Sequence, residues 1–158
     1  MRTRATRVLD ELGITYELRE FEAEAYTAAE AAARLGLAPG QVFKTLVART
    51  DDGRVAVACV PGDAALDLRA LAGLLGAKRA ALVDATELMR LVGYVKGAVS
   101  PLAQRRRHPV FIDASALRHP RISISAGVRG LQLWIDPRDL ARATGAQVVV
   151  LTGKVTRP

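Results

Sequence analysis

A single lysine interrupts an otherwise apolar run in the segment Gln41-Val42-Phe43-Lys44-Thr45-Leu46-Val47-Ala48. The run is rich in β-branched and aromatic residues, which predicts a β-strand. Because side chains alternate across a strand, Lys44 should share a face with Val42 and Leu46. A charge left in an apolar wall without a partner is costly, so the ammonium group must reach water, an anion or a ligand. Lys44 is therefore either an edge-strand lysine that extends to solvent or a cation on the wall of a pocket.

Composition indicates a globular protein, because half of the 158 residues are apolar and 25% are charged. We expect one domain over residues 1–158. A single cysteine, Cys59, excludes an internal disulfide, fits a reducing compartment and should be buried. The N-terminal segment carries acidic residues where a signal peptide would be apolar, and no apolar run is long enough to cross a bilayer. We therefore predict a cytoplasmic protein with no membrane partner.

The formal net charge of +7 favours a polyanionic partner such as nucleic acid. Most of the cations are arginines in an alanine-rich chain, a pairing that a G+C-rich genome also produces. Charge alone therefore carries modest weight.

Helical and strand patterns alternate along the chain. Helices are expected over 3–12, 27–36, 67–75, 84–93 and 136–145, and strands over 15–21, 41–48, 55–60, 80–83, 110–112, 122–125, 131–135 and 147–151. Thr27 and Glu30 form a capping-box pattern. Several neighbouring strands have hairpin signals, which favours an α+β fold with a mixed, mainly antiparallel sheet and flanking helices over a doubly wound parallel sheet.

Missing motifs exclude several chemistries. Two histidines and one cysteine do not provide metal-ligand spacing, so we expect no metal and no cofactor. Neither a dinucleotide-binding nor a Walker-type sequence occurs, and Ser100 is not in a Gly-x-Ser-x-Gly elbow. A zinc enzyme, a P-loop enzyme and a serine hydrolase are therefore all disfavoured.

The residues that remain suit the binding of an ester or a phosphate. Ser100 and Pro101 predict a helix N-cap and first turn, which would direct backbone N–H groups toward an anion. Gly97 allows the backbone to approach a ligand closely. Together with Lys44 and the turn 125–130, these residues could form a pocket that stabilises an oxyanion. The alternative is that the glycines serve tight turns and Ser-Pro serves an ordinary cap.

Four segments carry a resemblance to a known family. They are Gln41-Val42-Phe43-Lys44-Thr45-Leu46, residues 66–68 with 75–78, Gly93-Tyr94-Val95-Lys96-Gly97-Ala98-Val99-Ser100-Pro101, and Ser125-Ala126-Gly127-Val128-Arg129-Gly130. In register over almost the whole chain, they resemble the YbaK/EbsC family of the prolyl-tRNA-synthetase editing-domain superfamily. The resemblance implies a barrel-like mixed sheet and a metal-independent deacylase that hydrolyses mischarged aminoacyl-tRNA in trans, typically Cys-tRNA(Pro).

The resemblance also implies roles for individual residues. Lys44 corresponds to the essential lysine, which holds the tRNA acceptor end through phosphate or ribose, and Gly97 is the loop glycine of the catalytic site. The remaining residues implied in substrate binding are Tyr26, Thr27, Thr45, Ser100, Pro101, Ser125 and Gly127. With no protein nucleophile or base evident, positioning and charge stabilisation would supply much of the rate, with help from a thiol or hydroxyl of the substrate.

Two departures from the family pattern leave the substrate open. Ala103 stands where the family usually has glycine. Thr27, with Tyr26 just before it, stands where the cysteinyl enzymes have an aromatic residue beside the pocket. The sequence Tyr-Thr-Ala-Ala-Glu is closer to members that remove alanyl or other small groups. Cys-tRNA(Pro) is the first expectation and Ala-tRNA(Pro) the second. A non-catalytic tRNA-binding module and a synthetase partner with a vestigial pocket remain alternatives.

The arginine run Arg105-Arg106-Arg107 is a candidate contact for the tRNA acceptor stem. Its alternative is a solvated loop enriched in arginine by codon usage. Prolyl-tRNA synthetase is a possible protein partner under the resemblance. Trp134 lies in an alternating strand and should belong to the core.

Overall fold

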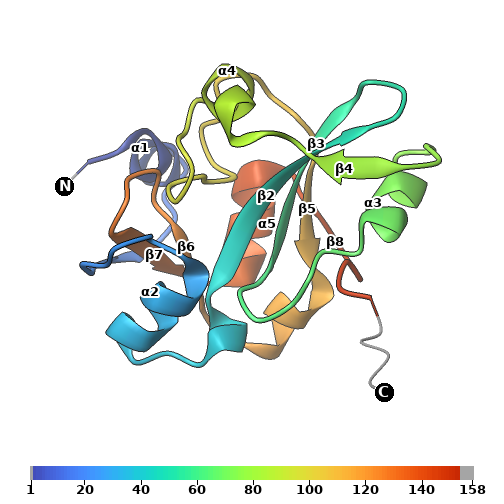
Figure 1. Ribbon diagram of the computed structural model, residues 1–158. Coiled ribbons are helices and arrows are strands. Elements are labelled where there is room, and N and C mark those ends of the chain that lie inside the picture. Colours follow the sequence, from blue (N-terminus) through green and yellow to red (C-terminus); the bar gives the residue numbers. More distant parts are fainter. Residues whose placement is uncertain (1, 154–158) are drawn as a thin grey trace.

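The computed structural model describes residues 2–153 and contains two β-sheets flanked by helices (Figure 1). The helices are α1 (Arg4–Glu11), α2 (Ala28–Leu35), α3 (Leu68–Leu74), α4 (Leu88–Val92) and α5 (Pro137–Thr144), with short 3-10 helices η1 (Pro39–Gln41), η2 (Ala85–Glu87) and η3 (Ala114–Arg118). The strands are β1 (Glu17–Glu20), β2 (Phe43–Thr50), β3 (Val55–Pro61), β4 (Ala80–Leu82), β5 (Val110–Asp113), β6 (Ile122–Ser125), β7 (Leu131–Ile135) and β8 (Gln147–Val149). Each α-helix and strand overlaps a segment predicted for it, although the predicted helix 84–93 is divided into η2 and α4.

The smaller sheet has the strand order β1-β7-β6 and the larger one β4-β2-β3-β5-β8. All pairs are antiparallel except β3 with β5 and β5 with β8. One isolated bridge, between Val42 and Ser123, joins the two sheets. The prediction of an α+β fold with a mainly antiparallel mixed sheet is confirmed. In the described residues the strands form two linked sheets instead of one closed barrel.

Helix ends follow the signals in the sequence. Thr27 accepts a hydrogen bond from the N–H of Glu30 while the Glu30 side chain accepts one from the N–H of Thr27, which is the predicted capping box. At α5, Asp136 caps the helix and Pro137 occupies its first turn. Over residues 2–153, no helix is long and apolar enough to span a membrane.

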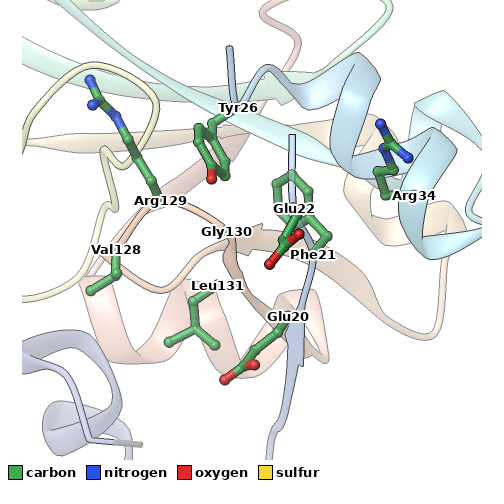
Figure 2. Close-up of a pocket in the computed structure, with 9 residues that line it drawn as sticks. All are labelled: Glu20, Phe21, Glu22, Tyr26, Arg34, Val128, Arg129, Gly130 and Leu131. Carbon is green, nitrogen blue, oxygen red and sulfur yellow. The ribbon is translucent and has the colours of Figure 1, made fainter. Parts of the chain in front are cut away.

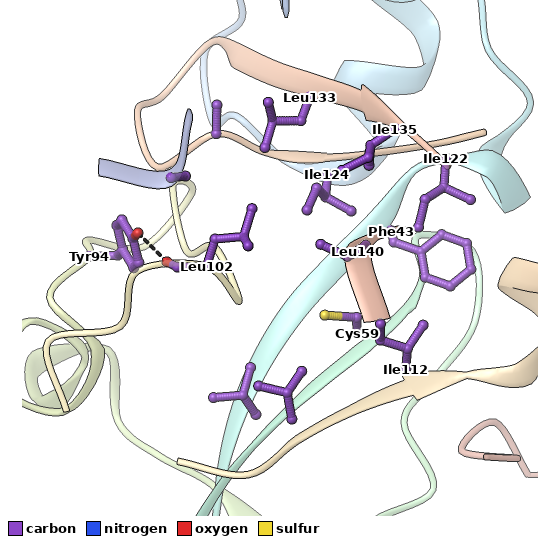
Figure 3. Packing of buried hydrophobic residues seen from close by; sticks show 14 of the residues in the cluster. Phe43, Cys59, Tyr94, Leu102, Ile112, Ile122, Ile124, Leu133, Ile135 and Leu140 are labelled. Atoms are coloured by element: carbon purple, nitrogen blue, oxygen red, sulfur yellow. Dashed lines mark hydrogen bonds between the residues drawn. The ribbon is translucent and has the colours of Figure 1, made fainter. Parts of the chain in front are cut away.

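Strand β2 lies between two hydrophobic clusters. Phe43 and Val47 pack into the larger one, whereas Leu46 and Ala48 pack against the smaller one. Figure 3 shows the larger cluster, in which side chains from β6, β7 and α5 meet Phe43. Because side chains alternate along the strand, Lys44 is on the same side as Leu46, as predicted.

Cys59 on β3 is fully buried beside β2. Its Sγ lies 3.7 Å from the Thr45 Oγ1, and burial raises the pKa of the thiol to about 12. The prediction of a buried cysteine is confirmed.

We expect Cys59 in the folded protein to resist an aromatic disulfide reagent at mildly alkaline pH, because neither access nor thiolate is available. The same protein in guanidinium chloride should react at once and with one equivalent of reagent. The release of the chromophore measures both rates. Rapid, complete reaction of the folded chain would contradict this placement.

Candidate active site

A cavity of about 450 Å³ lies beside the part of β2 that β4 leaves uncovered. Strand β4 pairs only with Ala48–Thr50, so the preceding half of β2 has an open edge on that side. The other walls are formed by the loop before α2, the segment 82–88, the loop around Gly97, and the ends of β6 and β7. The volume falls within the range of about 300–1,000 Å³ that is usual for small-molecule sites.

The open edge of β2 presents backbone groups of Thr45 to the cavity. Hydrogen bonding alternates along an antiparallel pair, so every second residue of β2 bonds to β3 and the residues between bond to the opposite side. The N–H of Thr50 donates to the C=O of Arg54 in the β3 hairpin, and the C=O of Val47 accepts from the N–H of Val83 on the other side. Thr45 therefore directs its N–H and C=O toward the cavity edge, where it is one of the lining residues.

The charged residues that line the cavity are Lys44 and Lys96. Carboxylate, histidine and cysteine side chains are absent from the lining found among residues 2–153. The Lys44 Nζ is 3.4 Å from the C=O of Gly62, a long hydrogen bond, and takes part in no ion pair within the described chain. The cavity is therefore electropositive, and its central ammonium group can still donate to a ligand.

Polar side chains of β6 and β7 form another wall. Ser125 lies directly opposite Gln132 in the strand register, and both line the cavity. The Ser125 Oγ accepts from the N–H of Gly127 at 3.0 Å, so its own proton remains available to a ligand. The Ser123 hydroxyl donates to the Oε1 of Gln132 at 2.8 Å, which leaves the amide N–H groups of Gln132 as donors.

Gln132 is a site residue that the sequence reasoning missed. A signal was present, because Ile122-Ser123-Ile124-Ser125 alternates apolar and polar residues and Gln132 interrupts the apolar strand facing it. Polar residues on one face of two paired strands indicate a hydrated or ligand-binding surface.

Three loops meet at the mouth of the cavity. Gly97 has a φ of +88°, and a Cβ placed there would lie 3.4 Å from the Tyr26 Cβ and 3.3 Å from the Arg129 Nε. The Arg129 Nε donates to the C=O of Lys96 at 2.9 Å. Close approach of the loops therefore depends on a glycine at position 97.

Tyr26 also borders a second, more open hollow of about 610 Å³. Figure 2 shows the Tyr26 ring between Arg129 and the segment Phe21–Glu22, with Gly130 below it in this view. Tyr26 therefore lines both the inner cavity and this second hollow, which we call the outer groove. Thr27, which caps α2, lines the inner cavity beside it.

Of the residues predicted for the site, the structure brings Tyr26, Thr27, Lys44, Thr45, Gly97 and Ser125 around this one cavity. Gly127 lies outside the lining and packs against an aromatic ring, since a Cβ there would be 2.7 Å from the Tyr94 Cε1. Its contribution to the cavity is the N–H that holds Ser125.

Ser100 and Pro101 are buried outside the cavity lining, and the prediction of a helical turn there is wrong. The Ser100 Oγ accepts from the N–H of Leu102 at 3.2 Å, so this N–H is not free for an anion. Leu102 is buried in the core, and its C=O accepts from the Tyr94 hydroxyl (Figure 3). Ala103 then has a φ of +54°, which a right-handed helix cannot accommodate.

The arginine run lies on an exposed loop, outside the cavity lining. The N–H of Arg105 donates to the C=O of Val92 at 2.9 Å, which ties the start of the run to the end of α4. Trp134 is half-buried under the Arg19 guanidinium, which stands 4.7 Å from the ring centroid.

The chain is similar in sequence and in fold to known proteins. A family model described as an aminoacyl-tRNA editing domain matches residues 22–143. A protein of Enterococcus faecalis named "Putative Cys-tRNA(Pro)/Cys-tRNA(Cys) deacylase EbsC" is 32% identical over 155 residues, covering 97% of this chain and 94% of that protein. The structure of hypothetical protein APE2540 has a TM-score of 0.88 at 30% identity, over 96% of this chain and 100% of the other. A structure described as "a putative trans-editing enzyme for prolyl tRNA synthetase" has a TM-score of 0.84 at 29% identity, over 97% and 99% of the two chains.

The fold is thus that of an editing domain that acts on aminoacyl-tRNA. Within that class, the chain belongs to the YbaK/EbsC family, which confirms the resemblance found in the sequence.

Replacing Ala103 by glycine should stabilise the protein by about 0.5–1 kcal/mol, because an L-residue at positive φ is strained by about 1–2 kcal/mol and part of the gain is offset by the flexibility of glycine when unfolded. Ala33→Gly, in the exposed part of α2, is the matched control and should destabilise by about 1 kcal/mol. Urea unfolding measures both changes. Equal destabilisation by the two substitutions would contradict the strained conformation at position 103.

Proposed function

We propose that this protein hydrolyses the ester bond of mischarged tRNA(Pro) in trans, with Cys-tRNA(Pro) as the favoured substrate. Its membership of an editing family and the name of its Enterococcus faecalis relative support the reaction and the aminoacyl group. The observation that carries the proposal is one cavity in which Lys44 is joined by Ser125, Gln132 and the backbone of Thr45. Such a reaction would take place in the cytoplasm, after a synthetase such as prolyl-tRNA synthetase has released the wrong product.

Lys44 would hold the acceptor end. Its ammonium group has a single long hydrogen bond among residues 2–153, so a phosphate or ribose oxygen can take its remaining donors. No carboxylate of the lining competes for the cation or repels a phosphate. This arrangement would hold the terminal adenosine with its ester inside the cavity.

Hydrolysis would depend on positioning and on stabilisation of charge. Water adds to the ester carbonyl carbon and gives up a proton, which forms a tetrahedral oxyanion. As the oxyanion collapses, the bond between the carbonyl carbon and the ribose oxygen breaks, the ribose oxygen takes up a proton, and the free amino acid is released. The Thr45 N–H, the Ser125 hydroxyl and the Gln132 amide are fixed donors that can face the developing oxyanion. Because the part of the lining that the structure describes contains no histidine or carboxylate, a thiol or hydroxyl of the substrate would assist the proton transfers.

Lys44→Ala should lower kcat/KM for Cys-tRNA(Pro) deacylation by about 100-fold, because the acceptor end would no longer be held and the ester would be misplaced relative to the donors of the cavity. The melting temperature should stay nearly constant, because the ammonium group makes little contact within the fold. Lys78→Ala, an exposed lysine beyond α3, is the matched control. Release of radiolabelled amino acid measures the rate.

Full activity of the Lys44→Ala variant would refute the role of the lysine. A panel of charged tRNAs then separates the alternatives. Preferential release of alanine from Ala-tRNA(Pro) would replace the cysteinyl assignment. Salt-sensitive tRNA binding with no release from any charged tRNA would indicate a non-catalytic binding module.

Changing Arg105, Arg106 and Arg107 together to glutamine should weaken tRNA binding and reduce the salt dependence of the binding constant. With fewer phosphates neutralised by the protein, fewer counterions are released when the tRNA binds. The exposed arginines Arg118, Arg138 and Arg142 on η3 and α5 provide a charge-matched control triple. Filter binding across a salt series gives both slopes. Equal slopes for the two triple variants would show that the run is only a solvated loop.

A further inference from the structure

The Glu30 carboxylate accepts hydrogen bonds from three backbone N–H groups in the loop that precedes α2 and borders the cavity. Its Oε1 accepts from the N–H of Thr27 and from the N–H of Ala25, both at 3.1 Å, and its Oε2 accepts from the N–H of Glu24 at 3.2 Å. The carboxylate thus holds three backbone donors on either side of Tyr26. We call this set of bonds the Glu30 clasp.

The clasp exceeds what a helix cap requires. A capping box needs only the two reciprocal bonds between Thr27 and Glu30. The bonds from the N–H groups of Glu24 and Ala25 to Glu30 lie outside the helix. These backbone donors lower the pKa of Glu30, the N–H of Thr27 having the largest effect, so the side chain is ionised at neutral pH. Charge-assisted bonds of this kind are stronger than bonds between neutral groups.

The loop needs such support because Tyr26 is strained. Its φ is +53°, a left-handed conformation that residues other than glycine rarely adopt. Such a conformation persists only where its surroundings impose it. Gly97 and Gly130 supply the packing, since a Cβ on Gly130 would lie 3.2 Å from the Tyr26 ring and one on Gly97 would lie 3.4 Å from the Tyr26 Cβ. Glu30 supplies the hydrogen bonds.

Ala25, Tyr26 and Thr27 are the parts of this loop that line the inner cavity, whereas Glu30 lines neither that cavity nor the outer groove. An effect of Glu30 on a ligand inside the cavity would therefore pass through the loop.

We propose that Glu30 is a positioning residue for the deacylation reaction, which fixes Tyr26 and Thr27 over the cavity before the tRNA acceptor end arrives. The inference rests on the proposed function. Without the clasp, the loop is ordered only part of the time, and the apparent affinity for substrate falls by the fraction of molecules with an ordered loop. Once substrate is bound and the loop is ordered, the chemical step is unchanged.

The test compares Glu30→Ala with Glu30→Gln and with the wild-type protein. In Glu30→Ala, amide hydrogen exchange of Glu24, Ala25 and Thr27 should accelerate at least tenfold, KM for charged tRNA should rise about tenfold, and kcat should change less than twofold. Glu30→Gln keeps a carbonyl acceptor and should recover part of the KM. Asp136→Ala removes the cap of α5, a helix of the same length as α2, and should leave KM unchanged.

Lower stability of Glu30→Ala with unchanged KM and unchanged exchange in residues 24–27 would overturn the proposal, because Glu30 would then be a helix cap alone. A fall in kcat with constant KM would also overturn it. Hydrogen exchange needs no substrate, so it tests the clasp independently of catalysis. A wild-type protein that deacylates no tRNA would refute the proposed function itself, whatever the exchange shows.

Discussion

The incomplete pairing of β2 is the constraint on which the site depends. One edge of this strand is bonded to β3 along its length, but the other is bonded to β4 only at Ala48–Thr50. A strand edge carries backbone donors and acceptors that must be satisfied by another strand, water or a ligand. The cavity lies where these groups remain open. The same strand anchors both hydrophobic clusters, so its position, and with it that of Lys44, is fixed by packing on both faces.

The chemistry of the cavity follows from which side chains surround that edge. Its charged members are two lysines, and its other polar members are hydroxyl and amide groups held by neighbours, as Ser123 holds Gln132. Such a surface attracts an anionic or oxygen-rich ligand and stabilises negative charge that develops on it. Among the described residues, the lining has no carboxylate or histidine to abstract a proton at neutral pH. The proposed substrate, an aminoacyl ester whose side chain carries a thiol, would supply the group for proton transfer itself.

Local sequence patterns predicted the helices, the strands and much of the cavity. The alternation in residues 41–48 placed Lys44, and the capping box placed Thr27 and Glu30, because both patterns depend on near neighbours. The prediction of a helical turn at Ser100–Pro101 was wrong for a physical reason. Ser-Pro is an ordinary start of a helix, but burial of Leu102 and the left-handed conformation of Ala103 turn the chain away. Gln132 was missed because its importance comes from Ser123 and Ser125 on the neighbouring strand, a pairing that periodicity in one segment does not reveal.

The contact between Thr45 and Cys59 has a consequence for an enzyme that handles activated esters. A thiolate within reach of an aminoacyl ester would capture the acyl group as a thioester and leave the protein modified. Here the only sulfhydryl of the chain lies behind the cavity wall, in contact with the Thr45 hydroxyl and too weakly acidic to ionise at neutral pH. The fold thereby protects the protein from being acylated by its own substrate.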